Sequence, residues 1–481
     1  MTASSPLSIV VLAAGKGTRM KSRLPKVLQP LGGRPMLAHV LHTAGALCAE
    51  RLVLVSGHGG DWVRQFADQH APALLPNTQL IHAEQPQQLG TGHAVQQAGA
   101  HLPDRGTVLI LLGDVPLVDA ETLQQVVACC SDSQIGLLTA ELVEPHGYGR
   151  IARDAQGRVQ AIVEHKDANA QQRAIREINS GIMALPAHRL KAWLNRLDND
   201  NAQGEYYLTD VIAMAVADQV AVQAHCLPVH QSWQVGGINS PAQLAEAERR
   251  YQRLQAEAAM DAGVRLVDPA RFELRAAPGS ALPGALTCES DVEIDIGCIF
   301  AGDVRIGSGS RIGAYCHISQ ADLGADCEVL PYSHIDGEAA GVVVGNGARI
   351  GPFARLRPGA RLAEDVHIGN FVEVKNSTLA RGAKANHLAY LGDAAVGERV
   401  NYGAGAITAN YDGANKHRTI IEADVHIGSN SVLVAPLTIG AGATVGAGST
   451  LSRDVPAHAL AVTRANASVV PDWQRPAKKK D

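Results

Sequence analysis

The chain has 481 residues, which is more than one hydrophobic core usually holds and predicts two or three domains. With 46% hydrophobic and 19% charged residues, its composition is typical of globular proteins and excludes intrinsic disorder. Only 4% of the residues are aromatic and the formal net charge is −5, so neither base stacking nor a positive field favours nucleic-acid binding.

The cysteines and the apolar stretches indicate where the protein works. The eight cysteines have no metal-binding spacing, and they predict free thiols in a reducing compartment. No apolar stretch is long enough to cross a membrane, and the apolar run near the N-terminus breaks too early for a signal peptide. We therefore expect a cytoplasmic protein without membrane insertion.

Residues 1–237 alternate between strand-like and helix-like segments. The segment 35–50 is amphipathic and begins with a proline suited to a first helical turn, so it predicts a helix. Four continuous apolar runs predict buried parallel strands at 7–14, 51–57, 78–84 and 107–114. This alternation predicts a doubly wound, Rossmann-like α/β domain, whose ligands bind beyond the carboxyl ends of the strands.

The first predicted strand runs into a glycine-rich, cationic loop, "AAGKGTRM" at 13–20. Backbone amides in such a loop can hold phosphates, and we expect Arg19 and Lys26 to be the cations on them. The loop lacks both common glycine-rich phosphate signatures, so a simple turn is the alternative interpretation.

A lone carboxylate, Asp114, follows the fourth predicted strand in "LLGDVPLV" at 111–118. Mg²⁺ favours one or two carboxylates together with substrate phosphates, so this position suits a magnesium ligand. Capping of a turn or helix is the structural alternative for the same residue.

Residues 238–263 predict a linker helix rich in Ala, Glu, Gln and Arg, and from 264 to 481 the sequence has a different period. Aliphatic residues now recur every six positions, which identifies an internal repeat. Three hexapeptides predict one triangular coil with the aliphatic side chains inside, and about ten coils stack at roughly 4.8 Å. Three such series are Ile294, Phe300, Ile306, Ile312, Ile318; Val344, Ile350, Leu356, Leu362, Ile368, Val374; and Ile421, Ile427, Leu433, Ile439, Val445, Leu451.

Many short motifs in both halves occur in a recognisable order. The first half contains "LAAGKGTRM", "LPKVL", "QQLGTGHA", "GDVPL", "GYGRI", "VEHKDA", "EINSGI", "GEYYLTD" and "GGIN", and the second contains "GPFARLRPGA", "GNFVEVKNS", "KANHLAYLGDAAVG" and "NYGAGAITANYDGANKHRT". Together they resemble the sugar-nucleotide pyrophosphorylases, and specifically the bifunctional family that joins N-acetylglucosamine-1-phosphate uridylyltransferase to glucosamine-1-phosphate acetyltransferase. The resemblance covers nearly the whole chain and implies that the repeat forms a left-handed parallel β-helix.

For the first domain, the resemblance implies a site for UTP, N-acetylglucosamine-1-phosphate and Mg²⁺. Arg19 and Lys26 would act on the phosphates as the catalytic cations, and Asp114 and Asn239 would hold the metal. The residues implied to bind UTP and the UDP-sugar product are Leu12, Ala13, Ala14, Gly15, Lys26, Gln85, Gly90, Thr91, Leu112, Gly113, Asp114, Gly149, Glu164, Asn179 and Asn239. Within this set, Gln85, Gly90 and Thr91 would contact uracil, and Gly149, Glu164 and Asn179 would contact the acetylated sugar.

The six-residue rhythm breaks between Val374 and Ile421, where inserted loops of a solenoid often form the binding face. The resemblance implies that His387 is the general base for acetyl transfer and that Glu373 orients it. Residues implied to bind glucosamine-1-phosphate are Arg357, Lys375, Tyr390, Asn401 and Glu373; those implied to bind acetyl-CoA are Ala404, Asn410, Tyr411, Ser429, Ala447 and Arg464. Because the family's coenzyme groove lies between β-helices, a homotrimer is implied. The basic tail 475–480 is most simply a solvated end.

We therefore predict a trimeric enzyme that acetylates glucosamine-1-phosphate and then couples the product to UTP, releasing pyrophosphate. A single-activity nucleotidyltransferase whose β-helix only oligomerises is the main alternative, and the motifs "NHLAYLG" and "NYGAGAITANYDG" argue against it. A non-catalytic sugar-nucleotide sensor is the second alternative. Arg19, Lys26 and Asp114 argue against a sensor, because binding alone needs no metal carboxylate opposite a phosphate loop.

Overall fold

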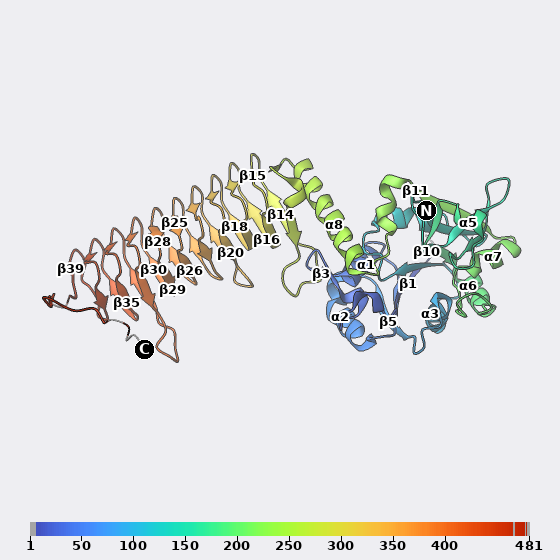
Figure 1. Ribbon diagram of the computed structural model, residues 1–481, viewed down its shortest axis with the longest axis horizontal. Helices are drawn as coiled ribbons and strands as arrows, with labels where there is room; N and C mark the ends of the chain where they lie inside the picture. Colours follow the sequence, from blue (N-terminus) through green and yellow to red (C-terminus); the bar gives the residue numbers. More distant parts are fainter. Residues whose placement is uncertain (1–5, 465–466, 477, 479–481) are drawn as a thin grey trace. The chain divides into compact units, whose positions relative to one another are not determined.

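A computed structural model describes residues 6–464, 467–476 and 478. The chain forms two compact units (Figure 1). The first contains the residues up to Gln255 together with Arg275–Gly284, and the second contains Ala256–Leu274 and the residues from Ala285 onward. The long helix α8, Pro241–Asp261, corresponds to the predicted linker helix, and the point where the units divide lies within it.

The first unit is built on a nine-stranded, mostly parallel sheet in the order β11-β7-β10-β6-β1-β4-β5. Its strands are β1 Leu7–Ala13, β4 Arg51–Ser56, β5 Gln79–Glu84, β6 Thr107–Leu112, β7 Gln134–Glu141, β10 Glu177–Pro186 and β11 Ala221–Leu227, with the antiparallel pair β8 Arg150–Arg153 and β9 Val159–Val163 attached to β10. The four strands predicted from sequence are β1, β4, β5 and β6, and all four are confirmed as adjacent parallel strands. The predicted burial is wrong for β5, which lies at the edge of the sheet and has only Ala83 buried.

Helices cover both faces of this sheet (Figure 1). Alternate residues of the strands enter two separate hydrophobic clusters, so that Val11 and Leu54 pack on one face and Val10 and Val55 on the other. This pattern confirms the doubly wound architecture. The helices are α1 Met36–Gly45, α2 Gly60–Leu74, α3 Thr91–Ala98, α4 Ala120–Ala128, α5 Ala170–Arg173, α6 Ala187–Leu194 and α7 Asp210–Ala217.

Helix α1 is shorter than the helix predicted at 35–50, because it ends at Gly45. Between the end of α1 and the start of β4 at Arg51, Cys48 takes the left-handed conformation with φ of 50°. A left-handed residue cannot continue a right-handed helix, so the last five predicted positions form a turn.

The order β5-β4-β1-β6 reverses direction between β1 and β6. Chain connections leave the two strands toward opposite sides at such a point, and a crevice opens at the carboxyl ends. The residues that follow β1 and β6 are those predicted to bind the nucleotide and the metal, and the fold therefore brings these two segments to one edge of the sheet.

The second unit is a parallel β-helix with three faces per coil, as the six-residue period predicts. One coil, for example, consists of β22 Arg349–Ile350, β23 Arg355–Leu356 and β24 Arg361–Leu362, and the next coil pairs with it strand by strand. The first face contains β12 Arg265–Leu266, β15 Glu293–Ile294, β17 Arg311–Ile312, β19 Glu328–Val329, β22, β25 His367–Asn370, β28 Lys384–His387, β31 Asn401–Tyr402, β34 His426–Ile427, β37 Thr444–Val445 and β39 Leu460–Ala461. The other faces contain β13 Glu273–Arg275, β14 Ala285–Cys288, β16 Ile299–Ile306, β18 His317–Leu323, β20 His334–Asp336, β21 Val342–Val344, β23, β24, β26 Glu373–Lys375, β27 Thr378–Leu379, β29 Tyr390–Gly392, β30 Ala394–Val396, β32 Ile407–Ala409, β33 Thr419–Ile421, β35 Val432–Val434, β36 Leu437–Ile439 and β38 Thr450–Leu451.

The predicted inward-facing residues form one continuous hydrophobic core. Every member of the three aliphatic series is buried, including the single aromatic member Phe300. Core side chains of successive coils lie directly above one another because the strands pair in register, as Ile350 does with Ile368. The repeat thus supplies a rigid scaffold, and chemistry is left to its outer positions.

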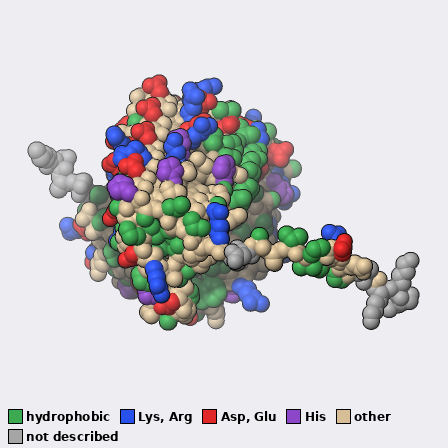
Figure 2. All heavy atoms as spheres, turned by 90° about the vertical axis from the view of Figure 1, so that its left-hand side faces the viewer, with side chains coloured by type: hydrophobic (Ala, Val, Ile, Leu, Met, Phe, Trp, Pro, Cys, Tyr) green, Lys and Arg blue, Asp and Glu red, His purple; other side chains and the backbone are tan. Residues whose placement is uncertain are grey.

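The surface, the cysteines and the helices also bear on the expectations from the sequence. On the face that Figure 2 presents, acidic and basic side chains are interspersed, whereas hydrophobic side chains gather in a band. All eight cysteines are free thiols, as predicted. Among the described residues, no helix combines the length and the apolar character needed to cross a membrane.

Packing between two neighbouring core positions can be tested by substitution. Ala385 pairs with Tyr402 in the next coil, and both are buried. We expect Ala385→Leu to overpack this layer and cost about 1–3 kcal/mol, and Tyr402→Ala to leave a cavity that costs about 3–5 kcal/mol. Urea unfolding followed by circular dichroism should show that the double variant loses less than the sum of the two. Strictly additive losses would contradict the packing of Ala385 against Tyr402.

Candidate active sites

The loop after β1 depends on one glycine. Gly17 has φ of 57°, and a Cβ at this position would lie 2.6 Å from Cβ of Lys26. Only glycine therefore lets the loop pass so close to Lys26. Arg19 lies in the short helix Thr18–Met20, and its exposed side chain is not among the residues that line the cleft described next.

A cleft of about 290 Å³ opens at the carboxyl ends of β1 and β6. It brings together predicted residues from four separate segments of the chain, which are Leu12, Ala13, Ala14, Gly15, Lys26, Gln85, Gly90, Thr91, Leu112 and Asp114. Four further lining residues were not predicted from sequence, namely Val27, Gln88, Ala94 and Glu205. Gly113 contributes its amide, which donates to the carbonyl of Leu12 at 2.9 Å and joins the two strand ends.

Lys26 connects the two predicted metal ligands. Its Nζ donates to Oδ2 of Asp114 and, at 3.0 Å, to Oδ1 of Asn239. The amide of Ile238 donates to the carbonyl of Asp114 at 2.9 Å, which fixes the segment carrying Asn239 beside β6. A carboxylate oxygen and an amide oxygen thus converge on one cationic atom. This hard oxygen donor set fits Mg²⁺, which takes its remaining ligands from phosphates and water.

The segment predicted to contact uracil is held by its own hydrogen bonds. Gln85 is 3% exposed, and its Nε2 donates to the carbonyl of Gly90 at 3.0 Å. Gln88 donates from Nε2 to the carbonyl of Gln85 at 3.2 Å and lies on the cleft wall. A Cβ at Gly90 would lie 2.5 Å from the carbonyl oxygen of Tyr206, so this turn also requires glycine.

The three residues predicted to hold the acetylated sugar lie together. The amide of Asn179 donates to the carbonyl of Gly149 at 2.9 Å, and a Cβ at Gly149 would lie 3.5 Å from Oε1 of Glu164. Burial raises the pKa of Glu164, and nearby carboxylates add to the rise, although a hydrogen bond from Thr209 at 3.1 Å opposes it.

The raised pKa of Glu164 gives a pH-dependent prediction. The pKa of Glu164 is higher in the folded protein than in the unfolded chain. The folded state therefore loses stability as the pH rises from the unfolded-state pKa through the folded-state pKa. Glu164→Gln removes this charge, so we expect a higher melting temperature than the parent at pH 7.5 and a difference that shrinks toward pH 4. Melting curves across this pH range test the effect on stability. We also expect KM for the acceptor sugar to rise in the variant, which tests the sugar contact. A variant that melts below the parent at pH 7.5 would contradict the electrostatic cost.

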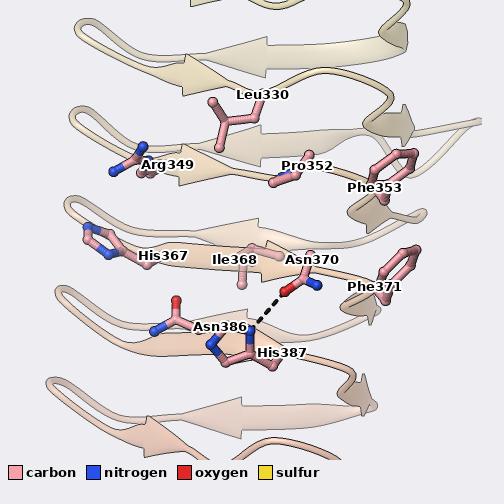
Figure 3. Close-up of a pocket in the computed structure, with 12 residues that line it drawn as sticks. Leu330, Arg349, Pro352, Phe353, His367, Ile368, Asn370, Phe371, Asn386 and His387 are labelled. Atoms are coloured by element: carbon pink, nitrogen blue, oxygen red, sulfur yellow. Dashed lines mark hydrogen bonds between the residues drawn. The ribbon is translucent and has the colours of Figure 1, made fainter.

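In the second unit, His387 lies at a corner of the β-helix beside a groove of about 430 Å³ (Figure 3). Its Nδ1 lies 2.8 Å from Oδ1 of Asn370, the residue directly above it in the preceding coil. The groove has an apolar wall containing Phe353 and Phe371, and its other side contains the cationic Arg349 and the imidazole of His367. Sequence reasoning missed Asn370, although its position 17 residues before His387 matches the length of one coil.

The predicted phosphate ligands lie on the adjoining face. Glu373 accepts hydrogen bonds from Arg357 at 2.8 Å and from Arg355 at 3.3 Å. These arginines, and not His387, are the hydrogen-bond partners recorded for this carboxylate among the described residues. Tyr390 pairs with Glu373 in the next coil. The ammonium of Lys416 lies beside Lys375 and lowers its pKa, and burial adds to this effect.

Lys416 was also missed from sequence. It pairs with Tyr411 in a small hairpin inserted where the six-residue rhythm breaks, and that break was the available signal. Asn410, before this hairpin, donates from Nδ2 to Asp393, while Tyr411 is 61% exposed.

Three of the predicted coenzyme residues form a column with His387. The backbone carbonyl of His387 accepts a hydrogen bond from the amide of Gly405 in the next coil. In the same way, the carbonyl of Ala404 accepts from the amide of Asn430, and the carbonyl of Ser429 accepts from the amide of Gly448. Ala404, Ser429 and Ala447 therefore occupy the same corner in successive coils. Asn401 lies on the first face in β31, and Arg464 is exposed near Gly446. Of the basic tail, residues 477 and 479–480 lie outside the described residues.

Comparison with known proteins agrees with both halves of this description. Residues 9–181 match the model of the MobA-like NTP transferase domain, and residues 341–376 and 418–453 match the bacterial transferase hexapeptide model. A protein of Acidovorax ebreus named bifunctional protein GlmU is 62% identical over 472 residues, which cover 98% of each chain. The chain belongs to the GlmU family. GlmU proteins of Methylibium petroleiphilum and Azoarcus sp. are 60% and 53% identical, and 98% of this chain is covered in each comparison.

Membership in the GlmU family establishes a bifunctional transferase. The first unit is a nucleotidyltransferase, which supplies uridylyl transfer, and the hexapeptide unit is an acetyltransferase. This result favours the two-activity interpretation over a single-activity enzyme and over a non-catalytic sensor. The roles of individual residues remain predictions.

Proposed function

We propose that the first unit transfers a uridylyl group from UTP to N-acetylglucosamine-1-phosphate and that the second unit makes this acceptor from glucosamine-1-phosphate and acetyl-CoA. The observation that carries the first half is the convergence of Asp114 and Asn239 on Lys26, which lines the switch-point cleft together with Asp114. The observation that carries the second is the column joining His387 to Ala404 and Ser429. We assign the two activities to residues 1–237 and 264–481, with 238–263 as the linker.

In uridylyl transfer, an oxygen of the sugar phosphate forms a bond to the α-phosphorus of UTP while the bond to the β-phosphate oxygen breaks, and pyrophosphate leaves. The protein positions the groups and balances their charge, and no covalent intermediate is needed. Lys26 and Arg19 supply the cations, and Glu164 and Asn179 orient the acceptor sugar. Asp114 and Asn239 would hold Mg²⁺, which supplies further neutralisation of phosphate charge when bound.

Asp114→Ala tests the first activity. Losing the carboxylate removes a direct metal ligand, a loss of several kcal/mol in the transition state, so uridylyl transfer should fall at least about 100-fold. Acetyl transfer should stay unchanged. Pyrophosphate release and thiol release measure the two activities in the same preparation.

The matched control for this variant is Asp119→Ala. Asp119 caps helix α4 through the amide of Thr122 and does not line the cleft, so its loss should cost stability of about 1 kcal/mol and little activity. If Asp114→Ala stays within tenfold of the parent, Asp114 is not the principal metal ligand.

In acetyl transfer, the free amine of glucosamine-1-phosphate attacks the thioester carbon. The new C–N bond replaces the C–S bond, and coenzyme A leaves as the thiol with the proton that the amine gives up. The amine is partly protonated at neutral pH, so a base must take its proton, and His387 is that base in our proposal. Arg357 and Lys375 bind the sugar phosphate, with Tyr390 beside them.

His387→Ala tests the second activity. General-base catalysis typically contributes 10²–10⁴-fold, so acetyl transfer should fall by about this factor while uridylyl transfer is retained. His367→Ala is the matched control, because His367 lines the same groove without a role in the proposed reaction. If the His387 variant keeps its maximal rate and only binds coenzyme more weakly, the base lies elsewhere.

An exposed apolar ridge supports the predicted trimer. The ridge consists of one corner residue from each of five successive coils, Tyr315, Tyr332, Phe353, Phe371 and Leu388, which are 45–62% exposed. Neighbouring rings stack at 5.5, 5.1 and 5.3 Å between centroids. All five have φ between 49° and 61°, a conformation that costs bulky residues about 1 kcal/mol or more each. Glycine occupies this corner at 405 and 448, so the bulky residues are not required by the turn. We assign the ridge to contact with a second copy of the chain beside His387.

Phe371→Glu tests the ridge. A charge at the centre of an apolar contact between copies should dissociate the trimer, because burying an unpaired carboxylate is costly. Light scattering after size exclusion should show a monomer, with acetyl transfer reduced and uridylyl transfer retained. Val343→Glu, at an exposed apolar residue away from the ridge, should remain trimeric. A Phe371 variant that is still trimeric would place the contact on another face.

A further inference from the structure

The partner of His387 within the chain is an amide. Asn370 ends β25 and His387 ends β28, and the two strands pair so that these residues lie directly opposite each other. Oδ1 of Asn370 lies 2.8 Å from Nδ1 of His387, and the two side chains point toward one another across the edge of the groove (Figure 3). The carbonyl of Asn370 also accepts from the amide of Leu388 at 3.0 Å, which holds the two corners together.

This contact determines which ring nitrogen can act as a base. An amide oxygen can only accept, so the nitrogen facing it must carry the proton. With the proton on Nδ1, the lone pair of the neutral imidazole is on Nε2. We propose that Asn370 is the positioning residue for His387, holding the ring in the tautomer and orientation that leave Nε2 free to take a proton. This inference rests on the proposed acetyl transfer and adds the residue that prepares its base.

No other side chain that lines the groove is seen to accept a hydrogen bond from the ring of His387 among the described residues. The charged or titratable side chains that line the groove with it are Arg349 and His367, and neither provides an anionic acceptor. Glu373, which the sequence predicted to orient His387, already accepts hydrogen bonds from Arg357 and Arg355 on the adjoining face. Asn386 lines the same groove next to His387, but no hydrogen bond of its side chain is recorded among the described residues.

A neutral acceptor has a specific advantage here. A carboxylate at position 370 would stabilise the imidazolium over the neutral ring and so keep His387 protonated to higher pH. An amide orients the ring with a smaller bias toward the charged form. Only the neutral imidazole can accept a proton from the sugar ammonium, so a neutral acceptor at position 370 suits a base better than a carboxylate would.

Two substitutions of Asn370 in the full-length enzyme test this role. Asn370→Ala should lower kcat for acetyl transfer about tenfold with KM for both substrates nearly unchanged, because the ring loses its orientation but not its basicity. Asn370→Asp should restore most of the rate at high pH and move the acidic limb of the kcat/KM profile upward by about one pH unit. A residue needed only for packing would give neither the rescue nor the shift.

Matched controls separate this inference from the function on which it rests. Asn386→Ala should behave like the parent, and uridylyl transfer in every variant reports that the chain is intact. If His387→Ala retains acetyl transfer, the proposed base itself is wrong. If His387→Ala is inactive while Asn370→Ala stays within twofold of the parent, or Asn370→Asp leaves the acidic limb unmoved, the base stands and the positioning role is overturned.

Discussion

Register between stacked coils is the constraint on which the second half of the molecule depends. Parallel strands of successive coils pair residue for residue, so every position of a coil has a fixed neighbour above and below it. The same rule places Ile350 over Ile368 in the core, Phe353 over Phe371 on the ridge and Asn370 over His387 at the groove. Core, surface and catalytic geometry are therefore set together, and a side chain's partner follows from the length of its coil.

In the first unit, the strand order of the sheet, and not the register of coils, brings the polar side chains together. There, residues far apart in sequence meet because the sheet reverses its strand order between β1 and β6. Lys26, Asp114 and Asn239 come from three segments and share one hydrogen-bonded centre. Two unlike architectures thus each gather polar side chains at an edge that their hydrophobic cores hold rigid.

Periodicity was the most informative property of the sequence. The alternation of apolar runs predicted the central strands, and the six-residue repeat predicted the inward positions of three series in the β-helix, all of which are buried. Core residues between Val374 and Ile421, such as Leu391 and Tyr402, lie where the repeat breaks and were not predicted by it. Helix ends were less predictable: α1 stops early because Cys48 adopts a left-handed conformation that no local pattern announces. Most residues proposed for the nucleotide line one cleft, whereas Arg19 does not.

The hydrogen-bond partners of individual side chains were the hardest property to predict from the sequence. Glu373 was expected to orient His387, yet its oxygens accept from two arginines one coil above, and the histidine contacts an amide instead. Such choices depend on whether a coil has 17 or 18 residues and on which corner each side chain occupies. The hairpin that brings Lys416 to Lys375 depends on an insertion whose path the repeat does not specify.

That insertion has a consequence for how such a scaffold can change. From Glu328 to Arg349 and from Asn401 to His426 the chain takes 21 and 25 residues to complete one circuit, and yet both pairs remain in register. Extra residues leave at a corner and return to the same rung, so the rungs on either side are undisturbed. A β-helix of this kind can therefore accept a new loop at one corner without changing the pairing of the neighbouring coils, so the column that contains His387, Ala404 and Ser429 keeps its geometry.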